Sequence, residues 1–273
     1  MTAAAPLHAL LFVPASRPER FAKALDAGAN AVIVDLEDAV EHPLKAQARN
    51  ALRDFLQANP QASVLVRVND ATTEWFADDI AVCAALPGVA GIVLPKTESA
   101  DQVAKVAACG KPVLPIIESA RGVLALADIA AAPGVTRLSF GALDMMLETG
   151  TQPDTEGARL VLNHIRGQIL LHSAAARLEP PIDSVYPNFS DDAGLQAVAQ
   201  QVRDMGFGGM LCIHPRQVKV VQQVFAPSAA ELEWAQRVVA QADETGSLAF
   251  QVDGKMVDAP VIARARRIVA AAS

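Results

Sequence analysis

The sequence predicts a closed (β/α)8 TIM barrel that carries a C-terminal helix–hairpin–helix extension. Short runs rich in β-branched residues recur about eight times, each followed by a helical pattern, which is typical of βαβ units in a parallel sheet. The length of 273 residues fits one barrel of about 250 residues plus a tail. A doubly wound open sheet is the alternative, but its glycine-rich phosphate fingerprint is missing from the first turn.

The first half of the chain contains four strand-like runs that end in polar or proline-containing turns. We expect these strands at residues 8–13, 31–36, 63–68 and 91–94. The second run is apolar on both faces, as a parallel strand covered on both sides should be. The turns that follow carry Pro14, the acid-rich Asp35-Leu36-Glu37-Asp38, Arg67 and Lys96.

The remaining four runs are expected at residues 112–118, 135–141, 182–186 and 209–213, with a long alanine-rich helix at 159–177. The fifth run ends in Glu118, followed by a Ser-Ala-Arg-Gly turn that opens a helix. Asp144 lies just past the Phe-Gly-Ala-Leu that closes the sixth. Two neighbouring strands therefore each deliver one carboxylate as they end.

A carboxylate at the end of a buried strand is costly unless a partner compensates its charge. Mg²⁺ prefers oxygen ligands and takes only one or two protein carboxylates, so it is the natural shared partner of Glu118 and Asp144. Taken alone, Glu118 could instead cap a helix amide and Asp144 could pair with an arginine. The whole-chain pattern favours the metal, because many polar residues fall at carboxyl ends of different strands, where barrel enzymes place their chemistry. They are Asp35, Glu37, Arg67, Lys96, Glu118, Asp144 and His214.

Residues 226–273 exceed the needs of a barrel, for which residues 1–225 suffice. A helix at 229–243 is followed by strands at 249–252 and 255–257, which flank Asp253-Gly254, a typical two-residue hairpin turn. A basic helix at 260–271 follows. This extension either packs on the flank of the barrel or acts as a lid or arm exchanged between subunits, which would present Asp258 to a site.

The composition excludes several classes of function. The chain is 52% hydrophobic and has a net charge of −7 with no extended basic stripe, so nucleic acid is not expected as a partner. No run approaches the roughly 18 apolar residues of a membrane span, and the N-terminal segment lacks the positive start of a signal peptide. We expect a cytoplasmic protein whose Cys83, Cys109 and Cys212 are reduced core thiols.

An ordered set of motifs resembles a known family across nearly the whole chain. The motifs are LFVPASRPERFAKAL, VIVDLEDAV, LVRVN, IVLPK, PIIESARG, LSFGALD, IDSVYPNFSDDAGL and CIHPRQV. Together they resemble the citrate lyase β-subunit-like family, related to malyl-CoA and citramalyl-CoA lyases in the HpcH/HpaI aldolase superfamily. The resemblance implies a TIM barrel, a homotrimer or hexamer, Mg²⁺ at the barrel mouth, and cleavage or formation of a carbon–carbon bond in a 3-hydroxyacyl thioester.

The resemblance also implies roles for individual residues. Glu118 and Asp144 match the metal ligands, and Arg67 matches the arginine that holds the keto-acid oxygens. Asp258 matches a lid aspartate that enters the neighbouring subunit's site. The residues that match regions in contact with coenzyme A are Arg17, Arg20, Tyr186, Asn188 and Phe189. The chain departs from the family at Met210, where many relatives carry lysine, and at Ala174–Leu178.

Other polar residues at the predicted mouth receive supporting roles. Asp35 and Glu37 either hold metal-bound waters or pair with Lys96 and Arg67. Lys96 is expected to neutralise the acidic rim, because no companion group for a Schiff base is evident. His214 precedes a proline in a rigid strand end, so we expect it to make a structural hydrogen bond.

Several functions follow from the same site. The first is a lyase that acts on a coenzyme A thioester such as citramalyl-CoA, malyl-CoA or citryl-CoA, releasing a keto acid and acetyl-CoA. The second is the citryl-carrier-protein lyase subunit of a citrate lyase complex, which would need a carrier-protein partner. A malyl-CoA thioesterase and a non-catalytic thioester-binding barrel are further alternatives. The acyl groups differ by substituents worth only about 1–3 kcal/mol in a pocket, so the acyl group stays open.

Overall fold

The computed structural model describes residues 6–246 and 248–271. The described chain divides into two compact units, one formed by Leu7–Gln222 and another that continues from Gln223.

Within the described residues, eight parallel strands close into a barrel in sequence order. Closure comes from β8, which pairs with β1 through Ala9 and Met210. This confirms the predicted TIM barrel. The strands are β1 Ala9–Pro14, β2 Ala31–Asp35, β3 Val64–Arg67, β4 Val89–Leu94, β5 Val113–Ile117, β6 Ser139–Phe140, β7 Ile182–Asp183 and β8 Gly209–Cys212.

Aliphatic side chains from all strands except β6 form a buried cluster in the barrel. Leu10, Ile33, Leu65, Ile182 and Leu211 belong to one buried cluster. Barrel strands are covered on both faces, which is why their sequences are continuous apolar runs rather than alternating ones. The core is therefore aliphatic, as expected from an aromatic content of only 4%.

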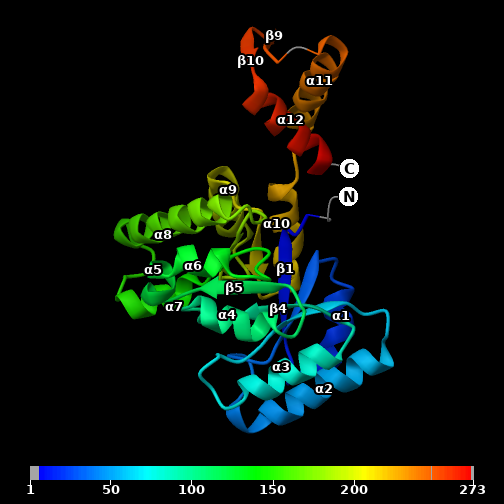
Figure 1. The fold of residues 1–273 in the computed structure, drawn as a ribbon, viewed down its shortest axis with the longest axis vertical. Coiled ribbons are helices and arrows are strands. Elements are labelled where there is room, and N and C mark those ends of the chain that lie inside the picture. Colours follow the sequence, from blue (N-terminus) through cyan, green and yellow to red (C-terminus); the bar gives the residue numbers. More distant parts are fainter. Residues whose placement is uncertain (1–5, 247, 272–273) are drawn as a thin grey trace. The chain divides into compact units, whose positions relative to one another are not determined.

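Helices connect the strands and surround them (Figure 1). They are η1 Pro18–Arg20, α1 Phe21–Leu25, η2 His42–Leu44, α2 Lys45–Ala58, α3 Phe76–Ala85, α4 Ala100–Ala107, α5 Ala120–Leu124, α6 Leu126–Ala131, α7 Ala142–Thr149, α8 Glu156–Ala175, α9 Asp192–Met205 and α10 Pro215–Phe225. The local sequence determines where several of these helices begin. Ser99 and Gln102 form a capping box at the start of α4, and the Thr155 hydroxyl caps the start of α8.

Two predicted strands are much shorter than the sequence suggested. The sixth keeps Ser139–Phe140 of the expected 135–141, and the seventh keeps Ile182–Asp183 of 182–186. Next to these two short strands, hydrogen bonds to side chains take the place of hydrogen bonds between strands. The Ser184 hydroxyl accepts a hydrogen bond from the Ala142 N–H, and the Arg137 guanidinium donates to the Pro180 carbonyl. The backbone there is irregular because its polar groups are satisfied without strand pairing.

The C-terminal unit has its own small core. It contains α11 Ala229–Thr245, the hairpin of β9 Phe250–Val252 and β10 Lys255–Val257, and α12 Ala259–Ala271. Asp253 and Gly254 both have positive φ, 52° and 75°, as a type I′ turn requires. Side chains of both helices and both strands, including Val238, Val257 and Ile262, pack together. The helix–hairpin–helix arrangement was predicted from the sequence.

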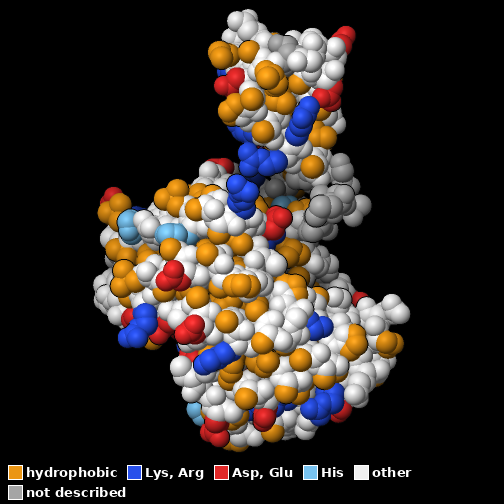
Figure 2. Space-filling view, viewed as in Figure 1, with side chains coloured by type: hydrophobic (Ala, Val, Ile, Leu, Met, Phe, Trp, Pro, Cys, Tyr) orange, Lys and Arg blue, Asp and Glu red, His pale blue; other side chains and the backbone are white. Residues whose placement is uncertain are grey.

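Several leucines of the barrel helices are exposed: Leu124 on α5 by 90%, Leu147 on α7 by 83% and Leu160 on α8 by 68%. Hydrophobic side chains lie among polar and charged ones on the part of the surface that carries these helices (Figure 2). Exposed apolar surface of this kind is typical of a face that contacts another protein.

The described part of the chain contains no helix both long enough and apolar enough to cross a bilayer. All three cysteines are free, and Cys83 and Cys212 are buried as expected. The expectation of a core position is wrong for Cys109, which is only half-buried. It follows α4 in a turn completed by Gly110, whose φ is 76°, so it lies where the chain reverses near the surface.

Candidate active site

The carboxyl ends of the strands enclose a cavity of about 290 Å³. Its polar lining includes Asp35, Arg67, Glu118 and Asp144, which the sequence had placed at the ends of separate strands. Its apolar lining includes Phe12, Ile116, Phe140 and Leu211. The structure therefore brings both predicted metal ligands and the predicted keto-acid arginine into one cavity.

Glu118 follows β5 directly and is 5% exposed. Its Oε1 accepts a hydrogen bond of 2.6 Å from the backbone N–H of Lys96, at the end of the neighbouring β4. Its other oxygen lies against Gly141, where an added Cβ would overlap Oε2. Only glycine at position 141 leaves room for the Glu118 carboxylate in this position. We call this close contact of the Gly141 backbone with the carboxylate the glycine cradle.

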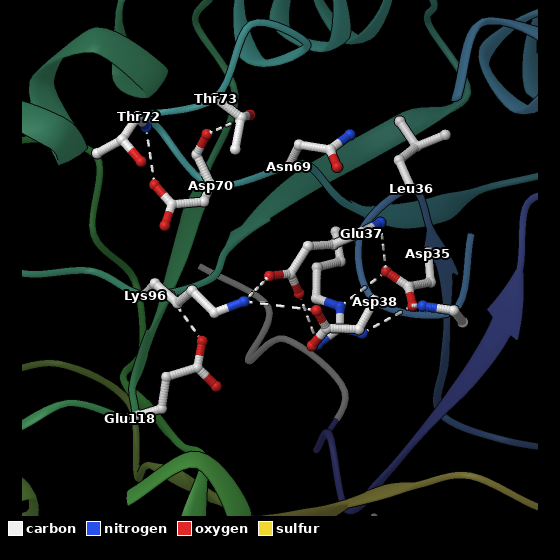
Figure 3. A network of polar contacts seen from close by, with 12 residues as sticks. Asp35, Leu36, Glu37, Asp38, Asn69, Asp70, Thr72, Thr73, Lys96 and Glu118 are labelled. Atoms are coloured by element: carbon white, nitrogen blue, oxygen red, sulfur yellow. Dashed lines mark hydrogen bonds and ion pairs between the residues drawn. The ribbon is translucent and has the colours of Figure 1, made fainter. Parts of the chain in front are cut away.

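Lys96 has a φ of 46°, a left-handed conformation that is uncommon for residues other than glycine. A strained backbone conformation is retained only where surrounding contacts hold it in place. Such conformations are common at functional sites. Here the conformation accompanies the hydrogen bond from the Lys96 N–H to Glu118. The side chain of the same residue forms an ion pair with Glu37 (Figure 3).

Burial raises the pKa of Glu118 to about 8. The Lys96 N–H opposes this rise, whereas the negative charges of Glu37 and Asp144 add to it. The ionised form of Glu118 is therefore destabilised unless a positive charge compensates it.

Asp144 is half-buried in the first turn of α7, three residues beyond Gly141. The start of this helix is tied to β7, because the Ala142 N–H donates to the hydroxyl of Ser184 at 3.0 Å. Ser184 is 3% exposed and also lines the cavity. We did not predict it; a serine directly after the last residue of a barrel strand was the available signal.

The turn after β2 carries acids that pair with basic residues of the next two strands. Both oxygens of Asp35 accept hydrogen bonds of 2.7 Å from the Arg67 guanidinium. One oxygen of the Glu37 carboxylate forms an ion pair with Lys96 (Figure 3). The other oxygen lies 3.1 Å from Arg67 Nη1. Burial raises the pKa of Glu37, and the charge of Arg67 opposes this. Of the two alternatives for Asp35 and Glu37, the structure therefore shows their pairing with Arg67 and Lys96.

The charges of the mouth and the turn behind it do not balance. Among the described residues that line these places, the acids are Asp35, Glu37, Asp38, Glu41, Asp70, Glu118 and Asp144, and the bases are Lys45, Arg67 and Lys96. Negative charges exceed positive ones by four when all are ionised. A divalent cation would compensate part of this excess, and the oxygen-only donors of Glu118 and Asp144 suit Mg²⁺.

The described residues contain no group of three or more His, Cys, Asp and Glu arranged to hold a metal ion. A site made of Glu118 and Asp144 alone is compatible with Mg²⁺, which keeps positions for water and substrate oxygens. The buried, uncompensated carboxylate of Glu118 and the glycine cradle behind it fit such an ion.

The residues predicted to contact coenzyme A lie outside the cavity lining. Arg17 and Arg20 are exposed at the η1 turn after β1. Tyr186 and Phe189 lie in the loop after β7, where the Tyr186 hydroxyl donates to Asp191 at 2.6 Å. Since β7, β8 and β1 are consecutive in the barrel, these two regions flank the end of β8 on the same rim. Asn188 belongs to the second region and is exposed.

His214 follows β8 and has local contacts. Its Nδ1 accepts the N–H of Arg216 at 3.2 Å, and its ring stacks on Phe189 with centroids 4.8 Å apart. These contacts agree with the structural role predicted for His214. They also order the loop that carries Phe189.

Asp258 lies in the C-terminal unit, between β10 and α12. Its Oδ1 accepts the N–H of Val261 at 3.4 Å, and its carbonyl accepts the N–H of Ile262 at 2.9 Å. Asp258 therefore caps α12, which gives its half-buried carboxylate a defined position within that unit.

Comparison with known proteins gives consistent matches. The family described as HpcH/HpaI aldolase/citrate lyase matches residues 8–215. A citrate lyase subunit beta-like protein from Mycobacterium tuberculosis is 42% identical over 95% of this chain and 93% of its own length. A (3S)-malyl-CoA thioesterase from Cereibacter sphaeroides is 38% identical over 98% of this chain and 95% of its own.

A solved structure is similar over the full length of the chain. It is the CitE protein from Mycobacterium tuberculosis in complex with magnesium, acetoacetate and coenzyme A. Its TM-score is 0.85 at 38% sequence identity, and the match covers 100% of this chain and 99% of that one.

Proposed function

The chain belongs to the HpcH/HpaI aldolase/citrate lyase family, and from this premise we propose that it is a Mg²⁺-dependent carbon–carbon lyase. Its substrate is a 3-hydroxyacyl-CoA thioester, and its products are a keto acid and acetyl-CoA. The observation that carries the proposal is the cavity in which Glu118, Asp144 and Arg67 meet. The similar CitE structure, which holds magnesium, a keto acid and coenzyme A, supports it.

Glu118 and Asp144 hold the Mg²⁺ ion in this proposal. When bound, Mg²⁺ acts as a Lewis acid toward the carboxylate and hydroxyl oxygens of the substrate. The hydrogen bond from the Lys96 N–H holds Glu118 Oε1, and Gly141 leaves room for Oε2. The ligand is therefore oriented by backbone atoms before the ion arrives.

Arg67 binds the carboxylate of the substrate through its planar guanidinium. Asp35 accepts hydrogen bonds from Nε and Nη2, and Glu37 pairs with Nη1, so the guanidinium is held in one orientation. One hydrogen on each of Nη1 and Nη2 remains to donate to the substrate. A fixed donor pair reduces the entropy lost on binding.

The reaction breaks the bond between the carbinol carbon and the carbon next to the thioester carbonyl. The hydroxyl gives its proton to the Asp258 carboxylate and becomes the keto group, while the electron pair of the broken bond passes to the thioester as an enolate. Asp258 then returns this proton to the enolate carbon to give acetyl-CoA. In the direction of synthesis, Asp258 removes a proton from the acetyl methyl group.

The cavity favours a keto acid with a single carboxylate. Arg67 is the basic residue of its described lining, and its nitrogens already face Asp35 and Glu37. A second substrate carboxylate would lie among Asp38, Asp144 and apolar side chains, where desolvation is costly. We therefore propose malyl- or citramalyl-type substrates ahead of citryl-CoA.

Asp258 serves the active site of a neighbouring subunit in this proposal, and the protein is a homotrimer or hexamer. The hairpin and α12 form a compact unit that carries Asp258 at a helix start. The exposed leucines of α5, α7 and α8 provide apolar surface for subunit contacts.

A thioesterase activity toward malyl-CoA is the second candidate function. The 38% identical relative named (3S)-malyl-CoA thioesterase favours it. The same cavity would then bind the thioester, and water would release free coenzyme A together with malate.

One experiment separates these functions. Purified protein with Mg²⁺ is incubated with malyl-CoA, citramalyl-CoA and citryl-CoA, while keto acid, acetyl-CoA and free coenzyme A are quantified. The lyase produces keto acid and acetyl-CoA in equal amounts, with citramalyl-CoA or malyl-CoA cleaved faster than citryl-CoA. Free coenzyme A without keto acid shows the thioesterase, and the absence of any product contradicts both.

A further inference from the structure

Lys45 is a buried basic residue that the proposed mechanism does not use. It begins α2 and is 4% exposed. Its ammonium group donates to the carbonyl oxygen of Leu36 at 2.8 Å and to that of Glu37 at 2.7 Å. Lys45 therefore binds the backbone of residues 35–38, which we call the acidic turn.

The acidic turn is held by charged groups on both sides of its backbone. The Asp35 carboxylate accepts the N–H of Glu37 at 2.9 Å and of Ala39 at 3.2 Å. Lys45 takes the carbonyl oxygens of Leu36 and Glu37. Since N–H and carbonyl groups are both bound by side chains, the turn has one well-defined conformation.

The position of the turn decides where the Glu37 carboxylate lies. Glu37 is 5% exposed and reaches Lys96 on one side and Arg67 on the other. Arg67 is the residue that binds the substrate carboxylate in the proposed function. A displaced turn would remove the carboxylate beside Nη1 and disturb the Asp35 contacts of the same guanidinium.

The burial of this ammonium is costly, which argues against incidental packing. Burial lowers the pKa of Lys45, and the charges of Asp35 and Glu37 oppose this. The ammonium also lies 5.4 Å from the centroid of the Trp75 ring, a cation–π contact. A buried charge persists where hydrogen bonds and opposite charges compensate it, as they do here.

We propose that Lys45 is a positioning residue that fixes the acidic turn and thereby orients Arg67 for the substrate carboxylate. This inference rests on the proposed function. Because Arg67 binds the carboxylate in both ground and transition states, loss of Lys45 acts on KM and not on kcat.

A second cavity gives access to Lys45. It has a volume of about 570 Å³ and is lined by Glu37, Asp38, Lys45, Trp75 and Lys96 among others. A small alkylammonium ion can enter a cavity of this size and occupy the place of a truncated lysine. Adding such an ion to a variant with a truncated Lys45 therefore tests whether an ammonium group is needed at this position.

The test compares Lys45→Met and Lys45→Ala with Arg137→Met. Arg137 is a matched control: it is 8% exposed and donates to the Pro180 carbonyl at 2.6 Å, but it precedes β6, at the opposite end of the barrel. We expect both Lys45 variants to raise KM, and the Kd of pyruvate measured by calorimetry with Mg²⁺, by about 10- to 100-fold. We expect kcat to stay within about threefold of the wild type. Arg137→Met should lose stability but keep both constants.

Propylammonium should lower the KM of Lys45→Ala by about tenfold and leave Arg137→Met unchanged. Unchanged KM and Kd in folded Lys45→Met, or an equal loss in Arg137→Met, would overturn the inference. If the wild type releases no keto acid and binds no pyruvate, the proposed function fails instead. A crystal structure of Lys45→Met then decides the inference, which an unmoved turn at residues 35–38 would contradict.

Discussion

The Glu118 carboxylate and the Lys96 backbone N–H are joined by a hydrogen bond of 2.6 Å across two neighbouring strands of the barrel. The donor belongs to a residue with a φ of 46°, and the acceptor is buried against Gly141. Strained backbone and a buried acid thus meet at the proposed metal site. This arrangement orients the ligand through the backbone.

Removing either metal-binding carboxylate should abolish Mg²⁺-dependent cleavage. Glu118→Gln and Asp144→Asn keep the size of the side chains but replace an anionic ligand with a neutral amide. We expect kcat/KM for citramalyl-CoA or malyl-CoA to fall at least about a thousandfold, because the reaction loses its electrophile. Glu148→Gln, on the same helix as Asp144 but exposed, is the control and should keep full activity. Wild-type turnover in the double variant would refute the proposed mechanism.

The stability of the metal-free protein should fall as pH rises. The pKa of Glu118 is about 8 in the folded protein and 4.5 ordinarily, so the folded state binds the extra proton between these values. The free energy of unfolding contributed by this group therefore decreases from about pH 4.5 to about pH 8. Denaturant unfolding in EDTA measures it as the difference between the wild type and Glu118→Gln. A difference independent of pH would contradict the elevated pKa.

Gly141→Ala should weaken Mg²⁺ binding, because the new Cβ overlaps Glu118 Oε2 and displaces the carboxylate. We expect a loss of about 10- to 100-fold in Mg²⁺ affinity, measured by calorimetry. Gly167→Ala is the matched control, since a Cβ at Gly167 in α8 meets no atom within 4 Å. Equal Mg²⁺ affinity in the two variants would show that the cradle does not constrain Glu118.

Arg67→Lys should raise KM for the thioester although the charge is kept. A lysine cannot reproduce the two 2.7 Å bonds to Asp35 and still present a planar fork to the substrate. The loss of one charge-assisted hydrogen bond is worth about 1.5–3 kcal/mol, which predicts roughly a 10- to 100-fold lower kcat/KM. Steady-state kinetics with saturating Mg²⁺ measure it, and wild-type kinetics in Arg67→Lys would argue against a fork-specific contact.

Mixing two inactive variants should restore activity if Asp258 serves a neighbouring subunit. Asp258→Asn lacks the acid and Glu118→Gln lacks a metal ligand, so an exchanged pair rebuilds some complete sites. We expect each variant alone to be inactive and the mixture, after subunit exchange, to regain a measurable fraction of wild-type turnover. Asp253→Asn, in the same hairpin, is the control and should stay active. Persistent inactivity of a mixture shown to contain hybrid oligomers would place Asp258 in its own subunit's site.

The barrel and the acids at its mouth could be predicted because both are local patterns. Buried parallel strands are continuous apolar runs, and the residue that follows each run faces the same rim once the barrel closes. Glu118, Asp144, Arg67 and Asp35 were found in this way. No role was predicted for Lys45 from the sequence, although a lysine on the buried face of α2, which also includes Ala48 and Leu52, was a signal of a buried charge.

The sequence offered the pairing of Asp35 and Glu37 with Arg67 and Lys96 as one of two alternatives, and only the structure shows which contacts form. Arg67 bonds Asp35 across 32 positions, Lys96 bonds Glu118 across 22, and Gly141 meets Glu118 through a close approach of backbone to side chain. The short β6 and β7 likewise reflect side-chain bonds, such as that of Ser184 to Ala142, that replace strand pairing.

The sequence by itself determined the order of the strands, the acids and bases near their carboxyl ends and the likeness to a family, since these depend on neighbours along the chain. Only the tertiary structure decided which acid faces which base and where a glycine makes room for a carboxylate. Those outcomes depend on distances between segments far apart in the chain, and closure of the barrel sets these distances.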